Sequence, residues 1–200
     1  MVEKAGMNFG IFIQSLKQKP NPMSTTINLR QIKNFFVLLM LCALATNCKN
    51  TANNVANDTK TINTTLDAWH AAAGKADFDN YFKYFTDDAV FIGTDATENW
   101  NKKDFMVFSK PYFDKGKAWN FKSLERHIYF DATGNTAWFD ELLDTQMKIC
   151  RGSGVLTKQG DDWKIKQYVL SMTFPNAVLD SVLKFKSPTE DDLIKKMRTR

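Results

Sequence analysis

The sequence predicts an α+β fold in which three helices pack on one face of an antiparallel sheet. Between residues 62 and 112, apolar residues recur mostly at helical spacing, whereas from residue 119 to 174 they alternate with period two. Segments typical of turns interrupt the second region at 131–135, 145–148 and 159–162. Four consecutive strands joined by such turns are expected to form a meander.

Two helices are expected at the start of the folded region. The first is predicted from 61 to 73 and ends at Gly74, and four apolar residues share its buried face: Ile62, Leu66, Trp69 and Ala73. His70 lies one position beyond this apolar stripe, so we expect it at the edge of the core or in solvent. Phenylalanines at 78, 82 and 85 predict a second, short helix.

A short strand and a third helix are expected next. The apolar run 89–92 reads as a buried strand, and 93–100 as a loop. Asn101 and Asp104 form a capping box that would begin the third helix. Three aromatic residues of that helix are expected to point inward: Phe105, Phe108 and Tyr112.

The remaining elements follow from the alternating region. Its strands are predicted at 119–130, 136–144, 149–158 and 163–174. After Pro175 a short closing helix is expected near Val178. Ser187 and Glu190 form a second capping box around Pro188, which predicts a separate helix in a charged C-terminal tail at 186–200.

The N-terminus has the pattern of a signal peptide. Residues 35–45 are an unbroken apolar run, too short to span a bilayer and preceded by Arg30 and Lys33. Met23 stands at a natural start distance from this run and is predicted to be the true initiator. We therefore assign residues 1–47 to a leader, 48–60 to a disordered polar tether and 61–185 to the folded domain.

Three kinds of processing remain open for this leader. Cys48 follows a loose lipobox whose Asn47 departs from the small residue expected there, and its lipidation would anchor the protein in the cell envelope. Cleavage after Ala45, within an Ala-Leu-Ala sequence, would instead release a soluble secreted or periplasmic protein. An uncleaved membrane anchor is the third possibility.

Charge and cysteine content exclude several function classes. Removing residues 1–47 takes away five of the 27 basic residues and one of the 22 acidic residues, which lowers the net charge from +5 to +1. This loss removes the compositional support for nucleic-acid binding. Cys150 would remain without a pairing partner, so no disulfide is expected. The chain has only two histidines and no Cys-x-x-Cys motif, so we expect no metal site. It also has no nucleotide-binding motif, so we expect no cofactor.

The segment AWFDELL, residues 137–143, places two adjacent carboxylates in a predicted strand. Neighbouring side chains of a strand point to opposite faces, so only one of Asp140 and Glu141 can enter the core. Centring the hairpins on their turns puts Glu141 inside, opposite Gly152, together with His127 and Gln167. A buried carboxylate needs a partner or a chemical role, so Glu141 becomes the candidate functional residue.

The same registers predict the composition of the outer face. Asp140 would lie there beside Arg126 or Arg151, in a surface ion pair of little energetic value. Trp138 and Tyr168 would add an aromatic stripe, which suits a homodimer contact. On the inner face, Gly152 and Gly154 either leave a void for a ligand or mark a bulge that bends the sheet, and the two alternatives are compatible.

Several segments in this order resemble the SnoaL-like branch of the nuclear transport factor 2-like superfamily. They are FIGTD at 91–95 with Trp100, TAWFDE at 136–141, RGSGVL at 151–156, and WKIKQYVLS at 163–171 before Pro175-Asn176. The resemblance covers about residues 60–180. It implies a cone-shaped barrel of three N-terminal helices packed on a curved antiparallel sheet, with a deep apolar pocket and a dimer contact on the outer sheet face.

The resemblance leaves three kinds of function open, because the superfamily includes both enzymes and binding modules. The first is an exported module that binds a small apolar or amphipathic molecule. The second is an acid–base enzyme, of isomerase, dehydratase or hydrolase type, with Glu141 as base and His127 as proton shuttle. A histidine frequent in relatives is replaced by Val169, which weakens this alternative. The third is an interaction protein whose pocket is filled by its own side chains.

One set of residues is expected to line the pocket: Trp69, Phe91, Trp100, Phe105, Phe121, Tyr129, Phe139, Gln167 and Val169. Two acids of the 93–100 loop, Asp95 and Glu98, either close the mouth of the pocket or serve only as turn residues.

Overall fold

The computed structural model describes residues 54–199. Three predictions concern residues outside the described part of the chain: the leader at 1–47, the start at Met23 and the lipidation of Cys48. A helix spans residues 54–74 and ends at Gly74 as predicted, and α2 (Phe78–Phe82) follows it. The predicted disordered tether is therefore helical from residue 54 onward.

A polar contact ties residues 54–60 of the 54–74 helix to the sheet. Asp58 accepts hydrogen bonds from Lys158 Nζ at 2.8 Å and from Trp163 Nε1 at 3.1 Å. Both partners belong to the sheet, so the first turns of this helix are tied to it. The sequence between 48 and 60 is polar, and composition alone cannot reveal a partner a hundred residues away.

The sheet has six strands in the order β2-β1-β6-β5-β4-β3. Their bounds are β1 (Phe85–Ile92), β2 (Asn99–Asn101), β3 (Lys122–Phe130), β4 (Thr136–Thr145), β5 (Lys148–Gln159) and β6 (Asp162–Met172). The predicted four-strand meander, β3 to β6, is confirmed. The sheet is not purely antiparallel, because β1 pairs with β6 in parallel. The short strand β2, which pairs with β1, lies at the end of a segment that was predicted to be a loop.

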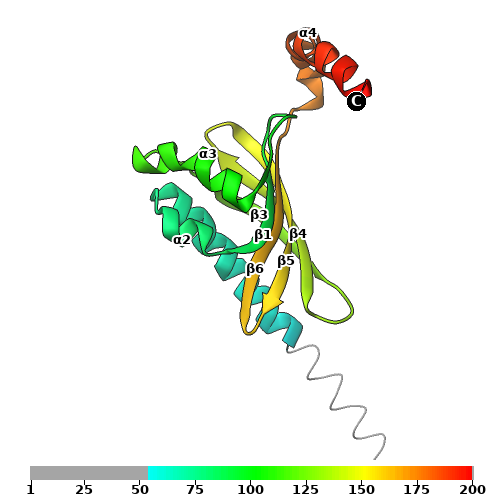
Figure 1. Cartoon of the computed structure of the whole chain (residues 1–200). Coiled ribbons are helices and arrows are strands. Elements are labelled where there is room, and N and C mark those ends of the chain that lie inside the picture. Colours follow the sequence, from blue (N-terminus) through cyan, green and yellow to red (C-terminus); the bar gives the residue numbers. More distant parts are fainter. Residues whose placement is uncertain (1–53, 200) are drawn as a thin grey trace, which may run out of the picture. The chain divides into compact units, whose positions relative to one another are not determined.

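The 54–74 helix, α2 and α3 lie on one face of the sheet, as predicted, and the sheet curves around them without closing (Figure 1). The core lies between the two layers and is rich in aromatic side chains. Its largest fully buried members include Trp69, Tyr81, Phe105, Trp163 and Tyr168. This is the α+β architecture expected from the change of hydrophobic period along the chain.

α3 (Lys102–Asp114) begins with the predicted capping box. Asn101 accepts a hydrogen bond from the Asp104 backbone N–H at 2.9 Å, and its amide donates to the Asp104 carboxylate at 2.8 Å. Phe105 is buried as expected. Phe108 and Tyr112 were expected inside but are exposed, and the buried aromatic residue near the end of the helix is Phe113.

The C-terminal segment forms one helix where two were predicted. After η2 (Asn176–Val178), α4 (Leu179–Arg198) continues through Pro188, so the Ser187 capping box does not begin a new helix. None of the residues of α4 is buried. No helix within residues 54–199 is both long enough and apolar enough to cross a membrane.

Candidate functional site

The two carboxylates of AWFDELL separate as the strand parity predicted. The side chain of Glu141 is completely buried, whereas that of Asp140 is half-exposed on the opposite face of β4. Glu141 pairs with Gly152 and Phe139 with Gly154, which confirms the predicted register of this hairpin. The inward carboxylate is therefore Glu141, and its surroundings decide whether it can act chemically.

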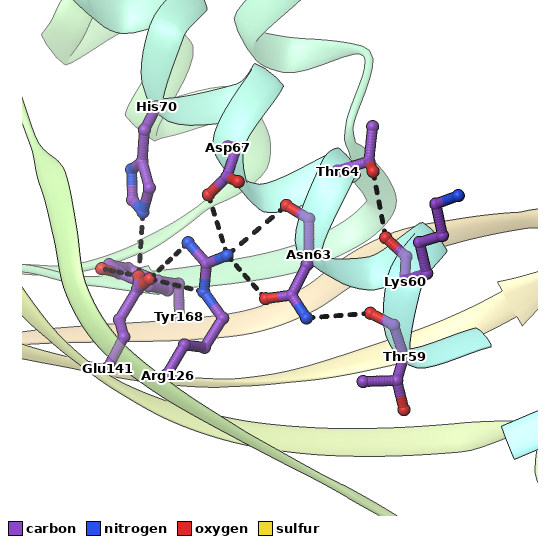
Figure 2. Close-up of polar contacts among 9 residues, drawn as sticks. All are labelled: Thr59, Lys60, Asn63, Thr64, Asp67, His70, Arg126, Glu141 and Tyr168. Carbon is purple, nitrogen blue, oxygen red and sulfur yellow. Dashed lines mark hydrogen bonds and ion pairs between the residues drawn. The ribbon is translucent and has the colours of Figure 1, made fainter. Parts of the chain in front are cut away.

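Three side chains from three different elements hold the carboxylate of Glu141 (Figure 2). His70 Nε2, from the 54–74 helix, and Tyr168 Oη, from β6, lie 2.9 and 3.0 Å from Oε1. Arg126, from β3, donates from Nε to Oε2 at 2.9 Å and brings Nη2 within 2.8 Å of the same oxygen. Both carboxylate oxygens are thus fully engaged.

Arg126 extends this cluster to the surface of the 54–74 helix. Its Nη1 donates to Asp67 Oδ1 at 2.9 Å and to Asn63 Oδ1 at 3.0 Å. The Arg126 side chain is only 4% exposed, and its guanidinium has a carboxylate on each side. A buried arginine in this position neutralises the buried Glu141 and joins helix to sheet.

The cluster keeps Glu141 ionised. Burial raises the pKa of Glu141, but the hydrogen bond and charge of His70 and the charge of Arg126 outweigh it, so the pKa lies below its usual range. Burial, followed by the neighbouring Glu141 charge, raises the pKa of Tyr168 far above its usual value. A general base near neutral pH would need the opposite shift on Glu141.

His127 does not reach Glu141, which contradicts the predicted catalytic pair. It pairs with Asp140 on the outer face, with Nδ1 3.1 Å from Asp140 Oδ1. The hairpin closes one residue later than predicted, because the Asp131 N–H bonds to the Thr136 carbonyl. This one-residue shift exchanges the faces of β3, so Arg126 turns inward and His127 outward.

A bulge in β6 changes which side chains of that strand face the core. Leu156 pairs with Ile165, but Val155 pairs with Gln167, so one extra residue lies on β6 between them. Beyond it, Tyr168 faces the core, while Gln167 and Val169 are only half-buried. The predictions that Gln167 and Val169 line the inner face, and that Tyr168 lies outside, are therefore wrong.

His70 was expected at the edge of the core or in solvent. The solvent alternative is wrong, because His70 is 3% exposed, and it lies at an edge of the core beside a depression. Its ring packs against Trp69 and Phe121, with centroids 4.7 and 5.8 Å away. A usable signal was present in the sequence. Asn63, Asp67 and His70 recur at helical spacing and form a polar stripe, which the structure pairs with Arg126 and Glu141.

The two glycines of β5 leave no void, which contradicts the pocket-making prediction for them. A Cβ at Gly152 would lie 2.2 Å from Tyr168 Oη, and one at Gly154 would lie 2.7 Å from the Phe139 ring. Neighbouring side chains therefore occupy the space over both residues. The alternative of a bent strand fits better, because the bulge of β6 lies opposite Val155, next to Gly154.

An apolar pocket lies elsewhere, among β1, β2, α3 and the turn between β4 and β5. Its volume is about 110 Å³, and four of the predicted residues line it: Phe91, Trp100, Phe105 and Phe121. Trp119 and Phe108 complete its aromatic wall. Glu98, and not Glu141, is the carboxylate that lines it.

The other predicted pocket residues lie outside this wall. Trp69 and Phe139 are buried in the core and do not line the aromatic pocket. Tyr129 was expected inside but is 46% exposed, because β3 is shifted by one residue. Its ring stacks with Trp138 on the outer face, with centroids 5.9 Å apart.

A second depression, of about 630 Å³, lies between the 54–74 helix and β3. His70, Arg126 and Asp67 line it, so the polar cluster borders solvent on this side. Phe121 belongs to the wall of both the depression and the aromatic pocket. Within residues 54–199, no group of three or more histidine, cysteine or acidic side chains could hold a metal ion.

Solved structures with the same architecture place this geometry among known folds. A proposed scytalone dehydratase from Novosphingobium aromaticivorans is 10% identical, with 62% of this chain and 89% of that chain covered and a TM-score of 0.54. A proposed dehydratase of the NTF2-like family from Streptomyces avermitilis is 12% identical, with 60% of this chain and 99% of that chain covered and a TM-score of 0.52. At such identities the likeness concerns the fold alone.

A third structure is a proposed aromatic ring hydroxylase from Novosphingobium aromaticivorans. It is 17% identical, with 60% of this chain and 92% of that chain covered and a TM-score of 0.52. No match was found among curated proteins. The profile of the SnoaL-like domain matches residues 62–175, which is more than half of the chain. The chain therefore belongs to the SnoaL-like family and has the cone-like NTF2 fold.

Proposed function

We propose that this domain binds a small apolar or amphipathic molecule in its aromatic pocket. The observation that carries the proposal is the wall itself, which combines six aromatic side chains with Met147 and Leu170 and contains no acid–base pair. Ligand sites are typically concave and apolar, with a few polar groups at chosen points. A cavity of roughly 150 Å³ holds benzene. The pocket, at about 110 Å³, is somewhat smaller, so it suits a group no larger than one ring or one branched alkyl group.

The state of Glu141 supports binding over catalysis. Its two oxygens are occupied by His70, Tyr168 and Arg126, and its pKa is lowered. Such a carboxylate stabilises the attachment of the 54–74 helix to the sheet. It is also absent from the wall of the aromatic pocket, where a ligand would lie.

Ligand-observed NMR with toluene and 3,3-dimethylbutanol tests the binding proposal. Both should give saturable signals, and Phe108→Ala should weaken binding at least about fivefold because part of the apolar wall is lost. Phe185→Ala is the matched control, since Phe185 is 84% exposed on α4 and lies outside the pocket. Absence of saturable binding by any small apolar compound would refute the proposal.

An acid–base enzyme is the second candidate, with His70 in place of His127. His70 lies 2.9 Å from Glu141 and lines the larger depression beside Arg126, and a carboxylate that orients an imidazole is a common catalytic arrangement. This candidate requires turnover of a substrate of isomerase, dehydratase or hydrolase type, such as a β-hydroxy carbonyl compound, that His70→Gln abolishes. Turnover unchanged in His70→Gln, or no turnover across a broad set of such compounds, would exclude it.

Export and dimerisation complete the proposed function. The apolar run at 35–45 and Cys48 support a lipid anchor in the cell envelope, which lipid mass on Cys48 would establish. The exposed stack of Tyr129 and Trp138 on the outer face supports a homodimer through the sheet. Sedimentation velocity should then show a dimer that Trp138→Lys converts to a monomer.

A further inference from the structure

Glu98 is the one ionisable side chain in the wall of the aromatic pocket. The other polar members of the wall, Thr94 and Gln146, are neutral. No lysine, arginine or histidine contributes to it. A single half-buried carboxylate therefore sets the sign of the electrostatic potential that a ligand meets there.

The loop between β1 and β2 holds this carboxylate in place. The Gly93 N–H bonds to the Glu98 carbonyl at 3.1 Å, and the Glu98 N–H bonds to the Asp95 carbonyl at 3.0 Å. The side chain folds back so that Oε2 accepts a hydrogen bond from the Asp95 N–H at 3.2 Å. A Cβ at Gly93 would lie 2.1 Å from that oxygen, so the glycine leaves room for the carboxylate.

The charge of Glu98 has no cationic partner within residues 54–199. Other acids close to it in sequence do have one, since Asp87 pairs with Lys102 and Asp88 with Lys166. Glu98 takes part in no ion pair of this part of the chain and accepts only the one backbone hydrogen bond. A carboxylate has about four acceptor positions, so most of its capacity is available to a ligand.

The rings around Glu98 also favour a positive ligand. The faces of aromatic rings carry negative potential, and tryptophan attracts cations most strongly. Two tryptophans, Trp100 and Trp119, line the pocket. Phe91 and Phe105 stack on each other with centroids 3.9 Å apart, so they supply apolar packing.

We propose that the pocket selects an amphipathic organic cation, meaning a small alkyl amine or quaternary ammonium compound. Its apolar groups would fill the aromatic wall, and its positive charge would lie beside Glu98. The inference rests on the proposed binding function and specifies the ligand class for the same pocket. A neutral molecule of the same shape would bind there more weakly, and an anion would be repelled.

Choline and 3,3-dimethylbutanol form a matched pair of probes, because the second replaces the quaternary nitrogen of the first with carbon. Ligand-observed NMR titrations on the full chain should show choline binding about tenfold more tightly. In Glu98→Gln this preference should disappear while 3,3-dimethylbutanol binds as before. The glutamine oxygen can still accept from the Asp95 N–H, so the loop is retained.

Glu190→Gln is the control variant, because Glu190 pairs with Lys186 on α4 and lies outside the pocket. It should bind both probes like wild type. Equal binding of the two probes by wild type, or an unchanged preference for choline in Glu98→Gln, would overturn the inference and leave the binding function standing. Binding of neither probe would overturn the inference, and absence of binding by toluene and other small apolar compounds as well would overturn the binding function.

Discussion

Replacing each acid of AWFDELL by its amide measures what burial and pairing do to a carboxylate. Glu141→Gln and Asp140→Asn make the same chemical change at adjacent positions on opposite faces of β4. Glu141 is buried with Arg126, whereas Asp140 is half-exposed beside His127. The first substitution should destabilise the fold strongly, and the second should leave the unfolding midpoint unchanged within error.

The magnitude for Glu141→Gln follows from what remains around Arg126. Removing one partner of a buried ion pair costs about 3–5 kcal/mol because it leaves an uncompensated charge. Arg126 keeps Asp67 and Asn63, and the amide oxygen can still accept from Tyr168. The loss should therefore lie at the lower end, about 3 kcal/mol, which corresponds to a fall of about 6–12 °C in Tm.

Urea unfolding followed by tryptophan fluorescence, together with calorimetry, measures both variants. The difference in unfolding free energy between wild type and Glu141→Gln should also depend on pH. The folded pKa of Glu141 is lowered, so its stabilising contribution is present above its unfolded value of 4.5 and is lost as pH falls through the folded pKa. Equal destabilisation by Asp140→Asn, or a Glu141→Gln difference that grows on acidification, would refute the reasoning.

Two further substitutions test contacts around this cluster. Gly152→Ala should cost about 1–3 kcal/mol of unfolding free energy, because the new Cβ would collide with Tyr168 Oη; an unchanged urea midpoint would contradict this close approach. Asp58→Asn should weaken the attachment of the first turns of the 54–74 helix to Lys158 and Trp163. Amide hydrogen exchange should then quicken at 54–60 and stay unchanged in β4, whereas uniform exchange would contradict the anchoring role.

Those parts of the fold that depend on local pattern could be predicted from the sequence. The change from helical to alternating spacing predicted helices before a meander, and Asn101 with Asp104 predicted the start of α3. Strand parity separated Asp140 from Glu141, and the predicted register of the β4–β5 hairpin, which the structure confirms, placed Glu141 inside. These features depend on residues close to one another in the chain, so a single sequence contains the information.

The site was predicted less well because it depends on register. The one-residue difference in the first hairpin moved Arg126 inward and His127 outward, and the bulge in β6 moved Tyr168 inward. Neither a late hairpin closure nor a bulge has a strong local signal in these segments. The contact of His70 with Glu141 was missed for another reason, because the two residues lie 71 positions apart in the chain.

Phe121 joins the polar cluster to the aromatic pocket. It lines the pocket, and its ring packs against that of His70 with centroids 5.8 Å apart. His70 is in turn held by Glu141 at 2.9 Å. Loosening the cluster therefore removes support from one wall of the pocket, and filling the pocket supports the cluster. Because such coupling is reciprocal, a pocket ligand should raise the stability of wild type by more than it raises that of Glu141→Gln. If the pocket binds a ligand as proposed, this outcome would show that the buried carboxylate contributes to binding through position, without touching the ligand.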